Sequence, residues 1–327
     1  MIKYRSRLFF TVQFLALQAI TAFSQGESGW TWRNPLPQGN DLWDVAYGNG
    51  RFVAVGTEAA LFSTNGLDWE ITTTPAKGRV GHVAFGNGVF VGQVNMFGVS
   101  RGPSLMVSTN GAQWAAVELD NYYFLVDLAF GNGQFVATGN GVTVTSSDGT
   151  TWVVHKSAYG LYNIVFGSGK FVALSGNATY TSSDGIEWVE HKISYPGFTS
   201  LAYINGKFLA TALTEFIGDF TRVELIESRD GANWSISSPA FPYPGPLKKA
   251  YNRVFSLGNP QAVTLDGANW NYLQVSGEGT LGQYTATSFA FGGGLWVAVG
   301  FGGAIWTSAD AHEWSRISSL LKYSRKI

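Results

Sequence analysis

The sequence predicts an all-β fold, a seven-bladed β-propeller of four-stranded antiparallel blades, because two motifs recur along it in alternation. The first is a pair of apolar runs around a Gly-rich turn, as in VAYGNGRFVAVG from Val45 and FAFGGGLWVAVG from Phe289. The second is a Ser/Thr, Asp/Asn, Gly turn that ends in Trp. The repeat is about 40 residues long, and units of that length with four strands are typical of propellers.

The first motif is a β-hairpin by its composition. Apolar residues alternate on both sides of Gly-Asn-Gly, which is the period of a strand and not of a helix. Asn and Gly tolerate the positive φ of a two-residue turn. Six copies begin at Val45, Val83, Leu128, Ile164, Leu201 and Phe289, and a degenerate copy, AYNRVFSLG, begins at Ala250. The sixth blade is therefore predicted to be the irregular one.

The second motif predicts a tight turn between the third and fourth strands. Asp or Asn can accept hydrogen bonds from the backbone of its own turn, and Gly takes the left-handed position. The Trp residues that close the copies are Trp69, Trp114, Trp152, Trp188, Trp234, Trp270 and Trp314. Trp30 and Trp32 lie in one more segment that resembles an outer strand. Eight segments thus compete for seven outer positions, and either end of the chain could close the ring.

With these motifs, residues 30 to about 318 resemble the Asp-box or BNR-repeat propellers, which include sialidases, xyloglucanases, sortilin-type receptors and the photosystem II assembly-factor group. The usual box reads S-x-D-x-G-x-x-W, and this chain has one residue fewer between Asp/Asn and Trp. That departure places it nearest to uncharacterised secreted bacterial propellers. The resemblance implies a fold and no particular activity.

The N-terminus has the pattern of a secretory signal peptide. Lys3, Arg5 and Arg7 precede an apolar run from Leu8 to Ile20, and small residues follow at the expected cleavage positions. The alternative is a membrane anchor, but the run is short of the roughly 20 residues that span a bilayer. We expect a signal peptide over residues 1–24, the propeller over 25–320 and a basic tail over 321–327. The protein would then be secreted, periplasmic or bound at the cell surface.

Composition narrows the partners. The chain is 45% hydrophobic and 13% charged, with a formal net charge of −1. It therefore lacks the basic surface that nucleic acid or an anionic membrane would need. Without Cys there are no disulfides, thiolate metal sites or cysteine nucleophiles. We expect a monomer without a cofactor, without a membrane span once the signal is cleaved, and with a protein or carbohydrate as its ligand.

One face of the predicted ring varies more than the other. The two kinds of turn lie on one face, whereas insertions at 93–105 and 211–224 and long interblade segments lie on the opposite, variable face, where function usually resides. Tyr and Arg suit recognition of proteins or glycans, although ordinary solvated loops also contain them. The candidate binding residues on this face are Arg79, Arg101, Tyr122, Tyr123, Glu215, Arg222 and Tyr243.

A second candidate site lies at the mouth of the central channel. Alignment of the innermost strands places a polar residue before each apolar pair. One interpretation is a small-ligand or cation site that uses Asp44, His82 and Asp127, and the other is a water-filled channel. The aligned residues are Asp44, His82, Asp127, Asn163, Ser200, Lys249 and Ser288.

The sequence predicts neither a catalytic residue nor a metal site. A sialidase needs three convergent Arg, but the segment around Arg33 only loosely matches the family's Arg-x-Pro motif. The four His have no paired metal-ligand spacing, and His155 and His191 occupy equivalent outer-strand positions. We expect an exported, non-enzymatic binding or assembly scaffold that uses the variable face. The alternatives are a divergent, sialidase-like glycoside hydrolase and one module of a larger cell-surface protein.

Overall fold

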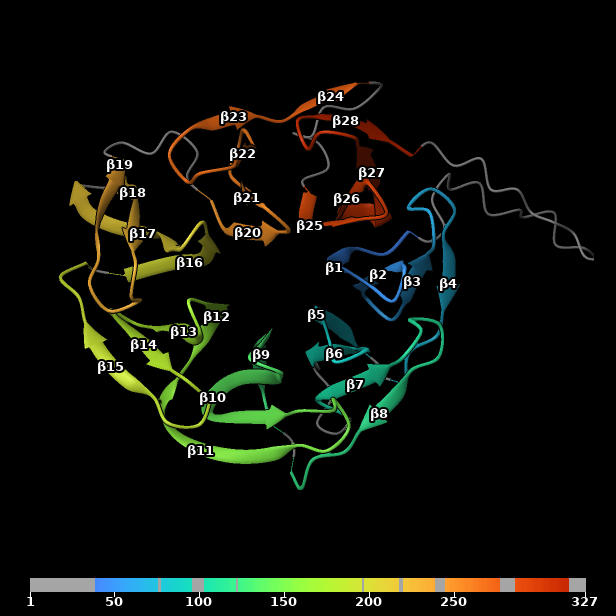
Figure 1. Cartoon of the computed structure of the whole chain (residues 1–327), viewed down its shortest axis with the longest axis horizontal. Helices are drawn as coiled ribbons and strands as arrows, with labels where there is room; N and C mark the ends of the chain where they lie inside the picture. Colours follow the sequence, from blue (N-terminus) through green and yellow to red (C-terminus); the bar gives the residue numbers. More distant parts are fainter. Residues whose placement is uncertain are drawn as a thin grey trace, which may run out of the picture. The chain divides into compact units, whose positions relative to one another are not determined.

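Seven sheets, antiparallel except for one added edge strand, follow one another along the chain and form a ring (Figure 1). The computed structural model describes residues 39–75, 78–95, 103–121, 123–195, 197–217, 220–238, 245–276 and 286–317. The predicted signal peptide and basic tail, together with Trp30 and Trp32, lie outside these residues. The all-β, seven-bladed prediction is confirmed.

Strand order within each blade follows the chain from the ring axis outward. Blades 1 and 2 are β1 (Leu42–Gly48), β2 (Arg51–Gly56), β3 (Ala60–Ser63), β4 (Glu70–Thr72), and β5 (Arg79–Gly86), β6 (Val89–Asn95), β7 (Leu105–Ser108), β8 (Ala115–Val117). Blade 3 is β9 (Leu125–Gly131), β10 (Gln134–Ser146) and β11 (Val153–Gly160). The first half of β10 pairs with β9 and the second half with β11, so this strand fills both middle positions.

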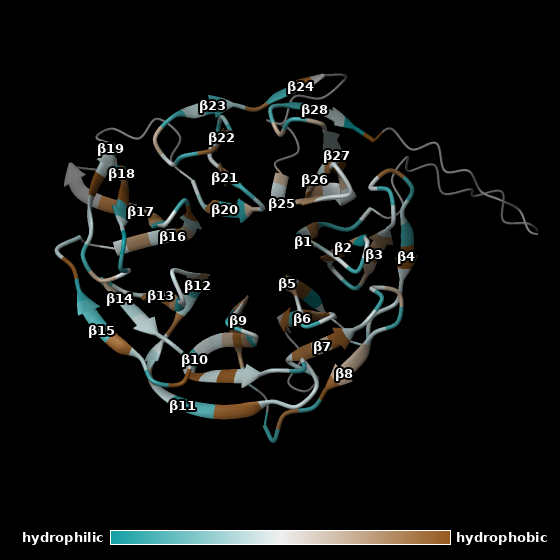
Figure 2. Ribbon diagram, in the orientation of Figure 1, coloured by the Kyte–Doolittle hydropathy of each residue, from teal (hydrophilic) through white to brown (hydrophobic). Residues whose placement is uncertain are grey.

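Blades 4 and 5 are β12 (Tyr162–Gly167), β13 (Lys170–Ser175), β14 (Ala178–Ser182), β15 (Val189–Lys192), and β16 (Gly197–Ile204), β17 (Lys207–Ile217), β18 (Phe220–Ser228), β19 (Ser235–Ser238). Blade 6 is β20 (Leu247–Ala250), β21 (Arg253–Ser256), β22 (Ala262–Thr264) and β23 (Trp270–Tyr272). Blade 7 is β25 (Ala286–Gly292), β26 (Leu295–Gly300), the 3-10 turn η1 (Phe301–Gly303), β27 (Ile305–Ser308) and β28 (Glu313–Arg316). Outer strands such as β4 and β15 carry hydrophilic residues (Figure 2).

Within the described residues, the segment that contains Trp314 fills the outer position of blade 7. β28, which contains Trp314, pairs antiparallel with β27 and fills the outer position. A fifth strand, β24 (Gln274–Ser276), adds to β28 in parallel. Blade 7 therefore has all four of its own strands, and it meets blade 1 by packing. Thr287 Oγ1 donates to Leu42 O at 2.8 Å across this junction.

The two predicted turns do lie together on one face, which we call the turn face. Asn49 and Gly50 take φ of 48° and 74° in a two-residue loop. Asn49 Nδ2 donates to Gly88 O and to Thr109 O, which belong to the two turns of blade 2. Asn87 makes the same pair of bonds to blade 3. Hydrogen bonds thus connect neighbouring blades across the turn face.

The Ser/Thr, Asp/Asn, Gly turn closes on itself as predicted. Ser146 Oγ accepts from Gly149 N at 2.8 Å, and Asp148 Oδ1 accepts from the backbone N of Thr150 and Thr151 at 2.7 Å. Trp152 Nε1 donates to Gly149 O. These backbone bonds hold the pKa of Asp148 well below its usual range. The carboxylate of this motif is therefore part of the turn.

Aromatic rings and glycines interlock between neighbouring inner strands. The residue before each Gly-Asn-Gly is aromatic in most blades, and its ring lies on the first Gly of the preceding blade. A Cβ added to Gly131 would lie 1.9 Å from the ring of Phe166. The same arrangement joins Gly48 with Phe85, Gly86 with Phe130, Gly167 with Tyr203 and Gly292 with Tyr47. The absence of a side chain at these glycines sets how closely the blades approach.

Candidate functional site

The predicted polar position on the inner strands exists in six blades. Counting back from each hairpin turn, it holds Asp44, His82, Asp127, Asn163, Ser200 and Ser288. A β-bulge or register shift occurs at or beside it in these blades. A bulge bends the strand and redirects a side chain, which accounts for polar groups here on otherwise apolar strands.

Lys249 does not belong to this set. Its register, opposite Val254, places it where Tyr47 stands in blade 1. Its Nζ lies 5.3 Å from the centre of the Tyr203 ring, and burial lowers its pKa. The alignment from the degenerate motif was wrong by three residues, because Tyr251 and Asn252 form the turn that Asn49 and Gly50 form elsewhere. Lys248, which was not predicted, reaches the site instead.

Asp44 is the centre of the cluster at this position. Asp44 is 8% exposed. Its carboxylate accepts hydrogen bonds from Val45 N at 3.0 Å and from Val83 N at 3.1 Å. It also accepts from the hydroxyl of Ser288 in blade 7. Lys248 Nζ lies 3.7 Å from Oδ1. One carboxylate therefore joins the inner strands of blades 1, 2 and 7 to a cation from blade 6.

Opposing effects act on the ionisation of Asp44. Burial alone would raise its pKa, but the Lys248 ammonium, the His82 ring and the Ser288 hydroxyl outweigh burial. The net effect holds the pKa of Asp44 well below its usual range. Asp44 is thus a stable anion at neutral pH.

Two other members repeat the bond to the next blade. Asp127 Oδ2 accepts from Ile164 N at 2.9 Å, and Ser200 Oγ accepts from Leu247 N at 2.9 Å. His82 Nδ1 lies 3.3 Å from Asp127 Oδ1 and 3.7 Å from Asp44 Oδ2. Within the part of the chain that the structure describes, no group of three metal-ligating side chains forms here. The hydrogen bonds of Asp44, Asp127 and Ser200 connect the inner strands of neighbouring blades.

A second cluster lies on the variable face, between blades 7, 1 and 2. The Arg79 guanidinium lies 3.4 Å from the centre of the Trp43 ring, and the Phe301 ring meets Trp43 edge-on at 5.2 Å. Trp43 Nε1 donates to Thr57 Oγ1 at 3.4 Å. Burial lowers the pKa of Arg79, and the Asp41 charge partly opposes this. We call Trp43, Arg79 and Phe301 the aromatic platform.

The remaining predicted residues of the variable face are dispersed. Tyr123 donates its hydroxyl to Asp120 Oδ1 at 3.0 Å, and burial, followed by this bond, raises its pKa. Arg222 Nε pairs with Glu224 Oε1 at 2.9 Å on the hairpin of β17 and β18, opposite Glu215 in the backbone register. Arg101, Tyr122 and Tyr243 lie outside the described residues. Only Arg79, among the predicted residues with described side chains, joins the aromatic platform.

The two outer-strand histidines have matching partners. His155 Nε2 lies 3.0 Å from Thr145 Oγ1, and His191 Nε2 lies 2.9 Å from Thr181 Oγ1. In both blades the His and its Thr partner are ten residues apart in the sequence. This repetition is what a structural role predicts.

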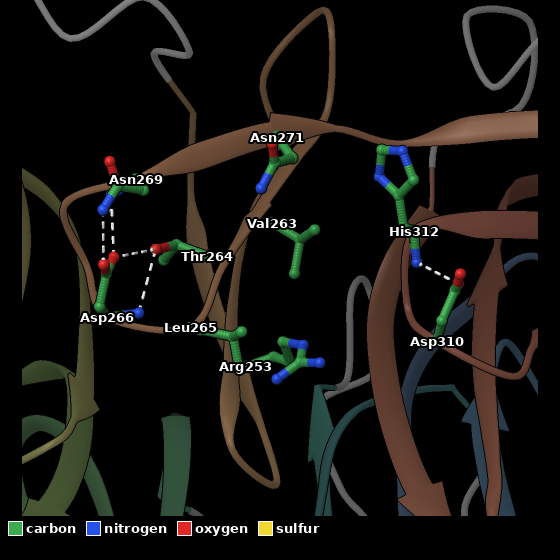
Figure 3. Close-up of a pocket in the computed structure, with 9 residues that line it drawn as sticks. All are labelled: Arg253, Val263, Thr264, Leu265, Asp266, Asn269, Asn271, Asp310 and His312. Atoms are coloured by element: carbon green, nitrogen blue, oxygen red, sulfur yellow. Dashed lines mark hydrogen bonds between the residues drawn. The ribbon is translucent and has the colours of Figure 1, made fainter.

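The turn face contains a cavity that we did not predict from the sequence. It lies between blades 6 and 7 and has a volume of about 400 Å³. Figure 3 shows Asn271 and Val263 on one side and His312 on the other, with Arg253 below. The complete lining is Arg253, Val263, Thr264, Leu265, Asp266, Asn269, Asn271, Asp310 and His312.

Comparison with known proteins finds similarity in structure alone. No protein-family model and no curated protein match the sequence. Among solved structures, YCF48 bound to D1 peptide superposes with a TM-score of 0.60 at 17% identity, over 84% of this chain and 97% of that one. The likeness is one of fold. The chain resembles a seven-bladed propeller of the YCF48 kind at low identity.

Two larger proteins contain similar propellers. An ancestral GH74 enzyme matches with a TM-score of 0.62 at 16% identity, over 88% of this chain and 47% of that one. PorZ, a surface component of the type-IX secretion system of Porphyromonas gingivalis, matches with a TM-score of 0.61 at 9% identity, over 89% and 39%. This chain spans less than half the length of either protein.

Sequence reasoning missed Trp43, Lys248 and the cavity. Trp43 lies in β1, LWDVAYG, and Lys248 in β20, LKKA. Both interrupt the alternation of small and large apolar residues that the other inner strands follow. A search for large or charged residues that break the alternation could have found both. The cavity had one signal, the missing Gly-Asn-Gly of the sixth copy.

Proposed function

We propose that this protein is an exported, non-enzymatic scaffold that binds an extended segment of another protein on its variable face. The aromatic platform is the observation that carries the proposal. It combines apolar ring surface with a guanidinium, and Trp and Arg of this kind dominate the energetics of protein interfaces. Arg79 Nε is buried and has no hydrogen-bond partner within the described part of the chain, so an acceptor that reached it would gain a charged hydrogen bond.

Two further facts support a binding role. The structure of YCF48, similar in fold over nearly its whole length, holds a D1 peptide. On the inner strands, Asp44 and Asp127 already accept backbone hydrogen bonds, which leaves them poorly suited to act as a catalytic pair. The relation to Asp-box propellers is part of the proposal, supported by the turn geometry of Ser146 and Asp148.

Selection of peptides tests the binding role. Random 12-residue peptides displayed on phage would be selected on the full chain and their affinities measured. For peptides selected on the wild type, we expect Trp43→Ala to weaken binding about tenfold or more, because a buried aromatic anchor supplies much of the affinity. The matched control is Leu67→Ala, since Leu67 is 52% exposed in a turn of blade 1 on the opposite face.

Two results would contradict the binding proposal. One is the absence of enriched peptides, and the other is enriched peptides whose affinity depends on Leu67 and not on Trp43. Binding of glycans but not of peptides on a carbohydrate array, if it were lost in Trp43→Ala and retained in Leu67→Ala, would assign the platform to a carbohydrate ligand instead.

Export is supported by the segment that runs from Lys3 through the apolar residues Leu8 to Ile20. Expression of the full chain in a bacterial host with a periplasm should yield a mature protein that begins near residue 25. Mass spectrometry of the purified protein measures this. An intact N-terminus in the cytoplasmic fraction would overturn the export proposal and leave the binding proposal standing.

A further inference from the structure

The junction between blades 6 and 7 differs from three other junctions on the turn face. At the junctions of blades 1 and 2, blades 3 and 4, and blades 4 and 5, the residue after the hairpin turn donates to a backbone carbonyl in the next blade. Arg51 Nη1 donates to Asn110 O at 2.7 Å, Lys170 Nζ to Asp230 O at 3.4 Å, and Gln134 Nε2 to Asp184 O. These bonds close the gap between neighbouring blades.

Arg253 occupies the same position in blade 6 but does not close its junction. By register it follows the turn as Arg51 does, opposite Ala250. Its guanidinium carbon lies 5.8 Å from the centre of the Trp296 ring of blade 7. Its Nη1 is buried and has no hydrogen-bond partner among the residues that the structure describes. A buried donor on a charged group that lacks a partner is costly, and such groups call for an explanation.

The cavity lies where the missing bond would be. β23 leaves blade 6 and continues into β24, which pairs with the outer strand of blade 7. The backbone N of Leu273 donates to Gln261 O in blade 6, and the backbone N of Gln274 donates to His312 O in blade 7. These two bonds connect the segment to both blades. Asn271 on β23 faces the space from above in Figure 3, with His312 across from it. The opening is therefore a cavity with a roof, and its volume of about 400 Å³ is that of a small-molecule site.

The charges around the cavity select the ligand class. Asp266 accepts from the backbone N of Ala268 and Asn269, and Asp310 from His312 and Glu313. Both carboxylates remain ionised, because these bonds lower the pKa of each although burial opposes them. Two carboxylates near one guanidinium repel an anion. Arg253, His312 and the amides of Asn269 and Asn271 nevertheless offer hydrogen bonds, and Val263 and Leu265 offer apolar surface.

We propose that this cavity, on the face opposite the aromatic platform, binds a neutral saccharide. Its hydroxyls would accept from Arg253 Nη1 and exchange hydrogen bonds with Asn271 and His312. The apolar side of the sugar ring would lie against Val263 and Leu265. The site is independent of the peptide-binding role, because it uses other residues on another face.

The test is saturation-transfer-difference NMR on the full chain with glucose, galactose, mannose, N-acetylglucosamine and glucuronate as probes. We expect at least one neutral sugar to bind saturably and more tightly than glucuronate. Arg253→Gln should weaken that binding about tenfold, the effect of losing one charged hydrogen bond. Arg51→Gln, the same substitution at the junction of blades 1 and 2, should leave it unchanged.

Asn271→Ala gives a second variant on the roof of the cavity, in case Arg253→Gln prevents folding. It should weaken the same sugar while leaving the thermal unfolding midpoint near that of the wild type, because Asn271 is exposed. The absence of binding by every neutral sugar would overturn the proposal. So would tighter binding of glucuronate, or affinity that is equal in the wild type, Arg253→Gln and Asn271→Ala.

Discussion

Replacing Asp44 with Ala should lower the free energy of unfolding by about 3 kcal/mol, the usual cost of removing one partner from a buried charged pair. The change leaves Val83 N without its acceptor and removes the hydroxyl contact of Ser288. It also leaves Lys248 without the carboxylate at 3.7 Å. Urea unfolding of the full chain, followed by tryptophan fluorescence, measures the loss.

Glu70→Ala is the control for this prediction, since Glu70 is exposed on the outer strand β4. It should change the free energy of unfolding by less than about 0.5 kcal/mol. If Asp44→Ala were as stable as Glu70→Ala, Asp44 would not hold the inner strands together.

The same carboxylate should make stability depend on pH. The pKa of Asp44 is lower in the folded protein than the ordinary value of 3.8, so its contribution is complete above that value and is lost as pH falls below it. Asp44→Asn has no such titration. The stability difference between the wild type and Asp44→Asn should therefore shrink as pH falls from about 5 to about 2. A difference that stays constant would show that the Asp44 charge does not contribute.

Gly131→Ala should be the second most damaging change, at about 2 to 3 kcal/mol. The added methyl would overlap the Phe166 ring of the next blade, and both inner strands are held by their hairpins. Thermal and urea unfolding measure the cost. Gly131 is not among the residues with positive φ, so the cost arises from packing and not from backbone strain.

A double mutant separates this overlap from other effects. Phe166→Ala alone should be destabilising. In the Gly131→Ala background the same change should cost less, because removing the Phe166 ring also removes its clash with the added methyl group. Costs that simply add would contradict direct contact between the two side chains.

The chain contains a natural version of this experiment. Ile204 stands where blade 4 has Gly167, and the next blade has Lys249 where others have an aromatic ring. At the following junction Ala250 replaces the Gly, and Phe291 stacks with Tyr251 at 4.8 Å. Where a side chain takes the place of the glycine, the ring that would lie on it is absent or lies elsewhere.

The repeated elements could be predicted from sequence because each is determined locally. Gly-Asn-Gly specifies a two-residue turn, and the Ser, Asp, Gly turn bonds to itself, as Ser146 and Asp148 show. A polar residue stands at the aligned inner-strand position in six blades, and its role as a ligand site stays a prediction. Lys249 was misplaced because the degenerate motif has Tyr251 and Asn252 in its turn. Alignment of the apolar residues alone therefore shifted this strand by three residues.

The contacts between blades could not be predicted in the same way. The stacking of Arg79 on Trp43 depends on a β-bulge at Leu42 and Asp44 and on a second blade. The cavity at Arg253 depends on a hydrogen bond that three other junctions make and this one lacks. Both arise from geometry between segments that the sequence pattern describes only one at a time.

The junction of blades 7 and 1 bears on how the protein folds. Every described blade is built from one continuous segment, so its pairing is local and should form quickly. The bonds from Thr287 to Leu42 and from Ser288 to Asp44 join residues 245 and 244 positions apart. The entropy of closing the longest loop therefore falls on this junction. Asp44 binds partners in blade 2 and in blade 7. Its charged hydrogen bonds therefore stabilise the closed ring once the last blade has formed.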